Sequence, residues 1–308
     1  MKTAYLALVA FLLAACAAAP DRPRESLGDL KAVEIPDYDS DRGIGWAASR
    51  EDYAAARADS RYAFEQFSYD SDGLTVGAYL YRPRSLSAKP SPVIVFNRGS
   101  WTRPKGFAGE MLVMAHRFAE AGYIVVAPHY RGSNGWAGKD ELGGAELHDL
   151  MVLPAVIGRI PGADASRLYL AGESRGGAMV YMALRDGFPA KAAAVWGAFT
   201  DLEPLVASGP LARAGAAIWP QYENDRETLY RTRSAMRFAD RLTTPILIMH
   251  GGADDDIPIS QSQRMDAELT RLGAKHKFIV FEGQKHVIGG RGAERDAATI
   301  AWFHECCG

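Results

Sequence analysis

A serine inside a Gly-x-Ser-x-Gly motif, placed directly after an apolar run, constrains the fold of this chain more than any other feature. The run Leu168–Ala171 has the composition of a buried strand, and Gly172-Glu-Ser174-Arg-Gly176 follows it at once. A helix-like segment, Met179–Leu184, comes next. This order is typical of a sharp strand-to-helix turn that lifts a serine hydroxyl above the edge of a sheet, although an ordinary glycine-rich turn is the alternative. The motif occurs once, so the sequence predicts one reactive serine, Ser174.

A serine hydroxyl is a weak nucleophile and needs an adjacent base that is itself oriented by an acid. Two loops downstream supply candidates, and each follows a strand-like run. Asp254 comes after the apolar run 245–251, and His286 comes after the run 277–281. Asp254 lies 80 residues after Ser174, and His286 lies 32 residues after Asp254. Each of these intervals is long enough to hold whole helix–strand units. The three side chains can therefore meet at the carboxyl edge of one sheet.

Strand-like and helix-like segments alternate along the body of the chain. Phe64–Tyr69 and Leu74–Tyr81 flank the turn Asp70–Gly73 and predict a hairpin. Farther along, short apolar runs separated by helical patterns over 109–121 and 144–160 predict a buried and mostly parallel sheet. The fold class predicted is therefore α/β, with a mostly parallel central sheet flanked by helices.

The chain resembles the catalytic domain of the prolyl oligopeptidase family of α/β-hydrolases, over about Phe64 to Phe303. Three segments carry the resemblance: Gly172-Glu-Ser-Arg-Gly-Gly177, His250-Gly-Gly-Ala-Asp-Asp-Asp-Ile-Pro258 and Gly283-Gln-Lys-His286. The resemblance implies an α/β-hydrolase fold and a serine hydrolase. Full-length members of that family carry a large β-propeller, and the residues before Phe64 are too few to form one.

The resemblance also assigns roles to single residues. It implies that Ser174 is the nucleophile, Asp254 the acid and His286 the base. Asp255 and Asp256 are competing acids in the same loop, and we expect them to form a solvated loop face.

Acyl transfer needs hydrogen-bond donors for the developing oxyanion. One donor is expected to be the backbone N–H of Arg175, the residue after the nucleophile. The second is expected from the loop that follows the strand-like segment 93–96. The family often carries a tyrosine or histidine before glycine there, whereas this chain has Asn97. The Asn97 side chain and a nearby backbone amide are both candidates, and an ordinary turn residue is the alternative for Asn97.

Two arginine side chains also flank the expected site. Arg98 and Arg175 could hold a substrate carboxylate, because a guanidinium binds a carboxylate through two parallel hydrogen bonds. We expect instead that they form ion pairs with nearby acids such as Glu173 or Asp149, since arginine often fixes loops in this way.

The amino-terminal residues 1–15 have the pattern of a secretory signal: Lys2, an apolar run and small residues before Cys16. Leu13-Ala-Ala-Cys16 resembles the lipobox of bacterial lipoproteins, which implies cleavage before Cys16 and acylation of its thiol and amine. Several acyl chains anchor a protein stably. The same resemblance implies the outer membrane, facing the periplasm, because Ala17 and not an aspartate follows the cysteine. A cleavable signal with a chance cysteine is the alternative.

These patterns divide the chain into a signal peptide over 1–15, a lipidated tether over 16–45 and a catalytic domain over 46–308. Within that domain, 197–243 is expected to be either a small helical cap or a long helical connection. The chain has 35 Lys and Arg against 37 Asp and Glu, without a basic patch, so no nucleic-acid partner is expected. No spacing of His and Cys indicates a metal, and no motif indicates a cofactor.

The sequence therefore predicts a serine hydrolase that works through an acyl-enzyme, anchored to the membrane by Cys16. A peptidase acting on short peptides is the main hypothesis. A carboxylesterase or acyl esterase is the alternative, since the same three residues can hydrolyse esters and amides. A non-catalytic envelope lipoprotein is a further alternative.

Overall fold

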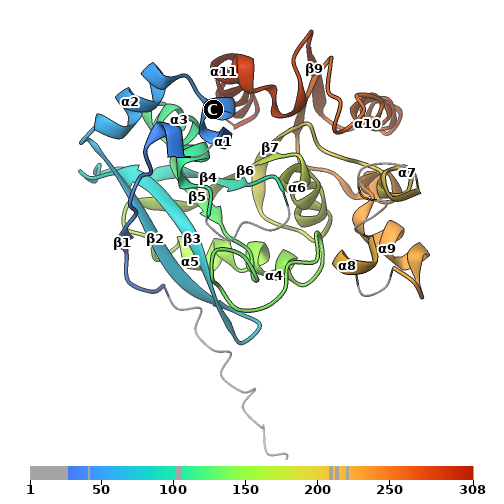
Figure 1. Cartoon of the computed structure of the whole chain (residues 1–308), viewed down its shortest axis with the longest axis horizontal. Coiled ribbons are helices and arrows are strands. Elements are labelled where there is room, and N and C mark those ends of the chain that lie inside the picture. Colours follow the sequence, from blue (N-terminus) through green and yellow to red (C-terminus); the bar gives the residue numbers. More distant parts are fainter. Residues whose placement is uncertain are drawn as a thin grey trace, which may run out of the picture.

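The structure is a computed structural model that describes residues 27–40, 42–100, 106–207, 211, 215–219 and 222–307. Within these residues nine strands form one sheet in the order β1-β2-β3-β5-β4-β6-β7-β8-β9 (Figure 1). The strands are β1 Lys31–Ala32, β2 Tyr62–Ser71, β3 Leu74–Pro83, β4 Ser91–Asn97, β5 Ile124–Pro128, β6 Ala163–Glu173, β7 Ala190–Trp196, β8 Ile246–Gly251 and β9 His276–Phe281.

Helices connect most of these strands. The α-helices are α1 Arg42–Ala47, α2 Arg50–Ala58, α3 Ala108–Glu120, α4 Glu146–Met151, α5 Leu153–Ile157, α6 Arg175–Arg185, α7 Leu202–Ala207, α8 Gly215–Ile218, α9 Arg226–Arg233, α10 Ser260–Arg271 and α11 Gly292–Cys307. Short 3-10 helices are η1 Tyr38–Ser40, η2 Ala235–Arg237, η3 Ala239–Arg241 and η4 His286–Arg291. None of the helices in the described ranges has both the length and the apolar character needed to cross a membrane.

The predicted hairpin is confirmed. Strands β2 and β3 pair antiparallel along their whole length, and Ser71 lies opposite Leu74. Only Asp72 and Gly73 remain in the turn, with φ angles of 50° and 76°. A two-residue turn with positive φ at both positions matches the twist of the flanking strands, and glycine adopts that conformation without strain.

Strands β4 to β9 pair in parallel, which confirms the predicted mostly parallel sheet. Along β4, Val93 and Val95 belong to one hydrophobic core, and Ile94 and Phe96 belong to the other. Successive side chains of a strand point to opposite faces of its sheet. Because helices cover both faces, these strands are apolar at nearly every position.

One group of helices covers each face of the sheet. Helices α1, α2, α3 and α11 pack on one face, and α4, α5, α6 and α10 pack on the other (Figure 1). The helix expected over 144–160 is interrupted, since α4 ends at Met151 and α5 begins at Leu153. Pro154 has no N–H to donate to the preceding turn, which accounts for the break.

The described part of the predicted tether packs on the domain, so a tether over 16–45 is wrong there. Strand β1 pairs with β2 at the edge of the sheet, and the Val33 N–H donates to Phe64 O at 3.0 Å. Ile44 is 1% exposed and contacts α3 at Gly109, where a Cβ would lie 2.5 Å from Ile44 Cδ1. These contacts therefore place residues 27–40 and 42–45 within the folded domain. Residues 1–26, with the expected signal and Cys16, lie outside the described residues.

The described parts of the segment 197–243 contain the helices α7, α8, α9, η2 and η3, joined by turns and loops. Leu229 and Tyr230 of α9 are buried in the same core as α6. Phe199 and Leu211 line the cavity above Ser174. The segment thus contributes to the wall of the site, and its action as a movable cap stays a prediction.

Candidate active site

Ser174 occupies the turn between β6 and α6, as the motif predicts. Its backbone has φ 51° and ψ −123°, a conformation that residues other than glycine rarely adopt. The Ser174 N–H donates to Trp196 O at 2.8 Å, and the Gly177 N–H donates to Ser174 O at 3.0 Å. Hydrogen bonds on both sides hold this strained residue in place, which raises its side chain above the sheet edge.

The two glycines of the motif are required by close backbone contacts. A Cβ at Gly172 would lie 2.5 Å from Gly176 O, and a Cβ at Gly176 would lie 1.9 Å from Asn97 O. Both distances are far shorter than any non-bonded contact. Glycine at position 172 therefore lets the turn close, and glycine at position 176 lets it pack against the end of β4.

The structure brings Ser174, His286 and Asp254 into one chain of hydrogen bonds. His286 Nε2 lies 2.9 Å from Ser174 Oγ, and His286 Nδ1 lies 2.8 Å from Asp254 Oδ2. Ser174 follows β6, Asp254 follows β8, and His286 follows β9. The carboxyl ends of these parallel strands lie at the same edge of the sheet, and this places three distant residues together.

The Asp254 carboxylate is buried, and both of its oxygens accept hydrogen bonds. Oδ1 accepts from the backbone N–H groups of Asp256 at 3.0 Å and Ile257 at 2.9 Å. Oδ2 lies 3.1 Å from His250 Nε2 as well as near His286. Burial alone would raise the pKa of Asp254, but the hydrogen bonds from the two histidines hold it well below its usual range. Asp254 is therefore ionised near neutral pH.

His250 of β8 is a second buried histidine that contacts the acid, Asp254. Its Nδ1 lies 2.7 Å from Ser262 Oγ, and its Nε2 lies 2.9 Å from Ile257 O. Because Ile257 O can only accept, Nε2 carries the proton and also faces Asp254. Its position four residues before Asp254, in the same motif, is the signal that points to this contact.

The His286 ring is suited to act as a base near neutral pH. Burial would lower the pKa of His286, but the hydrogen bond and charge of Asp254 raise it above its ordinary value. The negative charges of Asp256 and Glu173 act in the same direction. A base is most effective when its pKa lies near the working pH.

The two competing acids are exposed, as expected for a solvated loop face. The Asp255 carboxylate accepts from Lys285 Nζ at 2.7 Å. Asp256 contributes its backbone N–H to Asp254 and has an exposed side chain. Neither of the two carboxylates forms the contact to His286 that Asp254 forms.

The structure does not support the Asn97 side chain as an oxyanion donor. Asn97 is fully buried, and its amide donates to Val95 O and Ala171 O, both at 3.2 Å. Its Oδ1 accepts from the Tyr130 hydroxyl at 2.8 Å. Its side chain therefore ties β4 to β6 below the site. The Arg175 N–H is the first of helix α6 and has no partner within the helix, so its expected role as a donor stays a prediction.

The loop after β4 lies directly beside Ser174. The Arg98 guanidinium donates to Gly99 O and Ser100 O, both at 3.0 Å, and to His129 O at 3.0 Å. These bonds hold the loop against Ser174, since a Cβ at Gly99 would lie 3.3 Å from Ser174 Cβ. A backbone amide of this loop remains the candidate for the second donor.

The Arg175 side chain is part of a buried ionic network. Its Nη2 donates to Asp140 Oδ1 at 2.6 Å and to Glu146 Oε1 at 2.8 Å. Its guanidinium carbon lies 4.4 Å from the centre of the Tyr130 ring, and Arg98 Nη2 lies 3.4 Å from Asp140 Oδ2. Two arginines thus balance two buried carboxylates.

The expectation that Arg98 and Arg175 form ion pairs is confirmed, but the expected partners Glu173 and Asp149 are wrong. Asp149 pairs with Arg131, with Nη2 and Oδ1 2.6 Å apart. Arg175 has the partners Asp140 and Glu146, which approach it from the loop before α4 and from α4. The pairing is set by the segment 140–146, which is distant in sequence from both arginines.

A cavity of about 1320 Å³ opens above Ser174. Its apolar lining includes Met111 and Met114 of α3 as well as Phe199 and Leu211. A cavity of this size with mixed apolar and charged walls can hold a small organic substrate.

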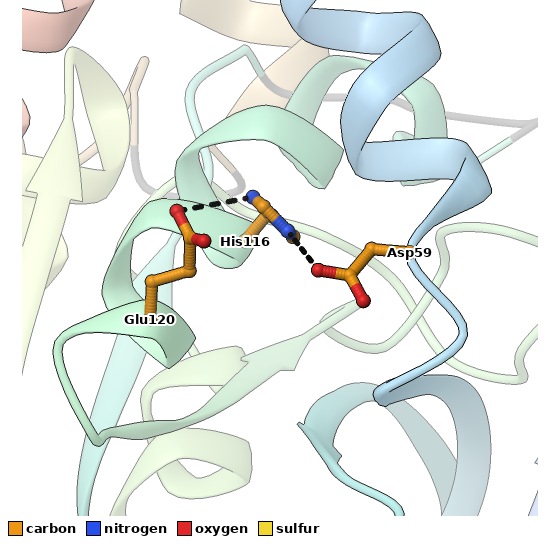
Figure 2. Close-up of side chains that lie close together, drawn as sticks. All are labelled: Asp59, His116 and Glu120. Atoms are coloured by element: carbon orange, nitrogen blue, oxygen red, sulfur yellow. Dashed lines mark hydrogen bonds and ion pairs between the residues drawn. The ribbon is translucent and has the colours of Figure 1, made fainter.

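Asp59, His116 and Glu120 form a separate cluster of possible metal ligands at the ends of α2 and α3 (Figure 2). His116 Nε2 lies 3.0 Å from Asp59 Oδ2, and His116 Nδ1 lies 3.7 Å from Glu120 Oε2. Arg61 donates to Asp59 Oδ1 at 2.9 Å and reaches Glu120 Oε1 at 3.2 Å. A guanidinium already balances these carboxylates, so the cluster is an ion-pair network.

A model of the prolyl oligopeptidase family matches residues 110–308. This match covers the strand-to-helix turn at Ser174, the loop that holds Asp254 and the loop that holds His286. The chain belongs to the prolyl oligopeptidase family. The expected α/β-hydrolase fold is confirmed by solved structures, among them an acylaminoacyl peptidase of Pyrococcus horikoshii. That structure has a TM-score of 0.69 and 22% identity, and the match covers 84% of this chain and 44% of that one.

Two curated relatives extend the comparison. An uncharacterized peptidase, YuxL, of Bacillus subtilis is 26% identical, and the match covers 93% of this chain and 44% of that protein. A putative carboxymethylenebutenolidase of Escherichia coli is 26% identical, and the match covers 72% of this chain and 76% of that protein. The chain thus spans less than half the length of its peptidase relative.

Proposed function

We propose that this chain is a serine hydrolase that cleaves short peptides through an acyl-enzyme. The observation that carries the proposal is the chain of hydrogen bonds from Ser174 Oγ through His286 to Asp254, with steps of 2.9 and 2.8 Å. Nucleophile and base lie within hydrogen-bond reach, and an acid orients the base from the other side. Membership of the prolyl oligopeptidase family supports the same reaction.

In the first half-reaction, His286 Nε2 takes the proton from the Ser174 hydroxyl while Oγ attacks the substrate carbonyl carbon. The carbonyl oxygen becomes an oxyanion, and the Arg175 N–H at the positive end of helix α6 stabilises it. The tetrahedral intermediate collapses, the C–N bond breaks, and His286 gives its proton to the leaving amine.

In the second half-reaction, His286 takes a proton from water, and the hydroxide oxygen attacks the acyl carbon. The bond from that carbon to Ser174 Oγ breaks, and His286 returns the proton to Oγ. Throughout, His286 Nδ1–H donates to the ionised Asp254, which stabilises the imidazolium that forms in each half.

A peptide substrate is favoured by the comparisons with peptidases, which include a probable dipeptidyl-peptidase 5 of Aspergillus terreus. An ester substrate is the second candidate. The Escherichia coli putative carboxymethylenebutenolidase favours it, since this chain matches most of that protein's length. A non-catalytic binding protein would have no need for the aligned Ser174, His286 and Asp254.

The test is a comparison of aminoacyl p-nitroanilides with short-chain p-nitrophenyl esters, using the purified chain and Ser174→Ala. We expect arylamide cleavage that falls by about 10⁴-fold or more in Ser174→Ala, as losses of a catalytic serine do. Ser166→Ala, an exposed serine that bonds to Asp164, is the matched control and should keep full activity.

The outcomes separate the candidates. Robust ester cleavage beside undetectable arylamide cleavage across a panel of amino acids would favour a carboxylesterase. Activity retained in Ser174→Ala would contradict the mechanism. Failure of the wild-type chain to react with a fluorophosphonate probe would favour a non-catalytic protein.

We also propose that the chain is a lipoprotein of the bacterial cell envelope, anchored through Cys16 and facing the periplasm from the outer membrane. The proposal is supported by the apolar run before Leu13-Ala-Ala-Cys16 and by Ala17 after it. Several acyl chains on one residue would give a stable anchor.

A further inference from the structure

Glu173 is the last residue of β6 and lines the cavity immediately before Ser174. Its carboxylate is half-buried and accepts two long hydrogen bonds. The Gly99 N–H donates to Oε1 at 3.3 Å, and the Trp196 indole N–H donates to Oε2 at 3.4 Å. In the part of the chain that the structure describes, no arginine, lysine or histidine forms an ion pair with this carboxylate.

Among the residues that the structure describes, the arginine and lysine side chains that line the cavity already have acidic partners. They form these pairs: Arg98 with Asp140, Arg175 with Asp140 and Glu146, Lys285 with Asp255, and Arg295 with Asp296. A half-buried carboxylate without a cation is costly to desolvate, so the site gains when a cationic ligand group arrives. The charge of Glu173 also contributes to the raised pKa of His286.

The space between Glu173 and the nucleophile is open because residue 99 is glycine. A Cβ at Gly99 would lie 3.2 Å from Glu173 Oε1 and 3.3 Å from Ser174 Cβ. The carboxylate and the Ser174 side chain therefore flank the same point. In an aminoacyl substrate the α-nitrogen lies only about 2.5 Å from the carbonyl carbon that Ser174 attacks. An α-ammonium is therefore the substrate cation best placed to reach Glu173.

We propose that Glu173 binds the protonated α-amino group of the substrate, so that the enzyme releases a single aminoacyl residue from substrates with a free amino terminus. This inference rests on the proposed serine peptidase function. An ammonium donates strong, charge-assisted hydrogen bonds to a carboxylate. An acylated amino group is neutral, and its binding would leave the carboxylate desolvated without a counter-charge.

The test compares alanine p-nitroanilide with N-acetylalanine p-nitroanilide, in the full chain and in Glu173→Gln. Glutamine has the same size and can still accept the Gly99 N–H bond, but it has no charge. We expect the wild type to favour the unblocked substrate. Glu173→Gln should lose about 10- to 100-fold in kcat/KM on that substrate and change little on the acetylated one, as the loss of a hydrogen bond to a charged group implies.

Asp256→Asn is the matched control, because this exposed carboxylate also lines the cavity and also raises the pKa of His286. The control should leave the ratio of the two substrates unchanged. All rates are compared on the pH plateau of each variant, so that a changed pKa of His286 does not mimic lost binding.

An equal fall in kcat/KM on both substrates in Glu173→Gln would overturn the proposal. It would mean that Glu173 acts by holding the Gly99 loop. Preference for N-acetyllysine p-nitroanilide that disappears in Glu173→Gln would overturn it too, by assigning Glu173 to a side-chain cation. Cleavage of both alanine substrates at similar rates by the wild type would overturn this inference alone. Cleavage of neither alanine substrate, nor of any aminoacyl p-nitroanilide in the panel, would overturn the peptidase function and this inference with it.

Discussion

His250 and His286 share one carboxylate oxygen: Asp254 Oδ2 lies 3.1 Å from His250 Nε2 and 2.8 Å from His286 Nδ1. His250 is fully buried, whereas the His286 side chain is 17% exposed and reaches Ser174. The buried histidine therefore fixes the acid, and the acid fixes the proposed base. A substitution of His250 or of Asp254 should therefore affect the hydrogen bond between His286 and Ser174.

The acid should be sensitive to loss of its charge. We expect Asp254→Asn to lower kcat by about 10²- to 10⁴-fold, because the imidazole loses the charge that orients and stabilises it. Steady-state kinetics on an aminoacyl arylamide measure this fall. Asp255→Asn is the matched control in the same loop and should cost far less, since its carboxylate faces Lys285. A larger loss in Asp255→Asn would show that the acid is assigned wrongly.

The pH dependence should follow His286. The base must be neutral to take the serine proton, so kcat/KM should fall as the pH drops through the pKa of His286. Asp254 and its neighbours raise that pKa above its ordinary value of about 6.5. Asp256→Asn removes one of these charges and should move the acidic limb to lower pH. The measurement is a pH profile of kcat/KM in both proteins, and a limb that moves to higher pH would contradict the assignment.

The buried ionic network should matter for stability. Arg175→Ala keeps the backbone N–H but leaves Asp140 and Glu146 without their main counter-charge. Removing one partner of a buried ion pair costs about 3–5 kcal/mol, so we expect a loss of this size in the free energy of unfolding. Denaturant titration measures it. Arg271→Ala, which removes an exposed ion pair with Glu268, is the control and should unfold like the wild type.

The lipid anchor should depend on one thiol. Cys16→Ser should block acylation, so that the protein moves from the membrane fraction to the soluble fraction. Cell fractionation followed by mass spectrometry of the mature amino terminus checks both points. Cys306→Ser, at the other end of the chain, is the control and should stay with the membrane. An unmodified mature amino terminus in the wild type would contradict the lipobox assignment.

The sequence was sufficient to predict the strand-to-helix turn at Ser174, because local glycine spacing dictates that backbone shape. It also predicted that Asp254 and His286 lie near Ser174, since loops after parallel strands meet at one edge of the sheet. The first prediction depends on a short local segment. The second needed only the assumption that the apolar runs before Asp254 and His286 lie parallel to the run before Ser174 in one sheet.

The tertiary structure alone decided where other side chains point. Asn97 lies at the predicted strand end, but its amide is drawn into the core by Val95 O and Ala171 O. Arg175 meets Asp140 and Glu146, which are 35 and 29 residues away. A buried polar group must find partners wherever the packed elements place them, and those positions are set by the whole fold and not by adjacent residues.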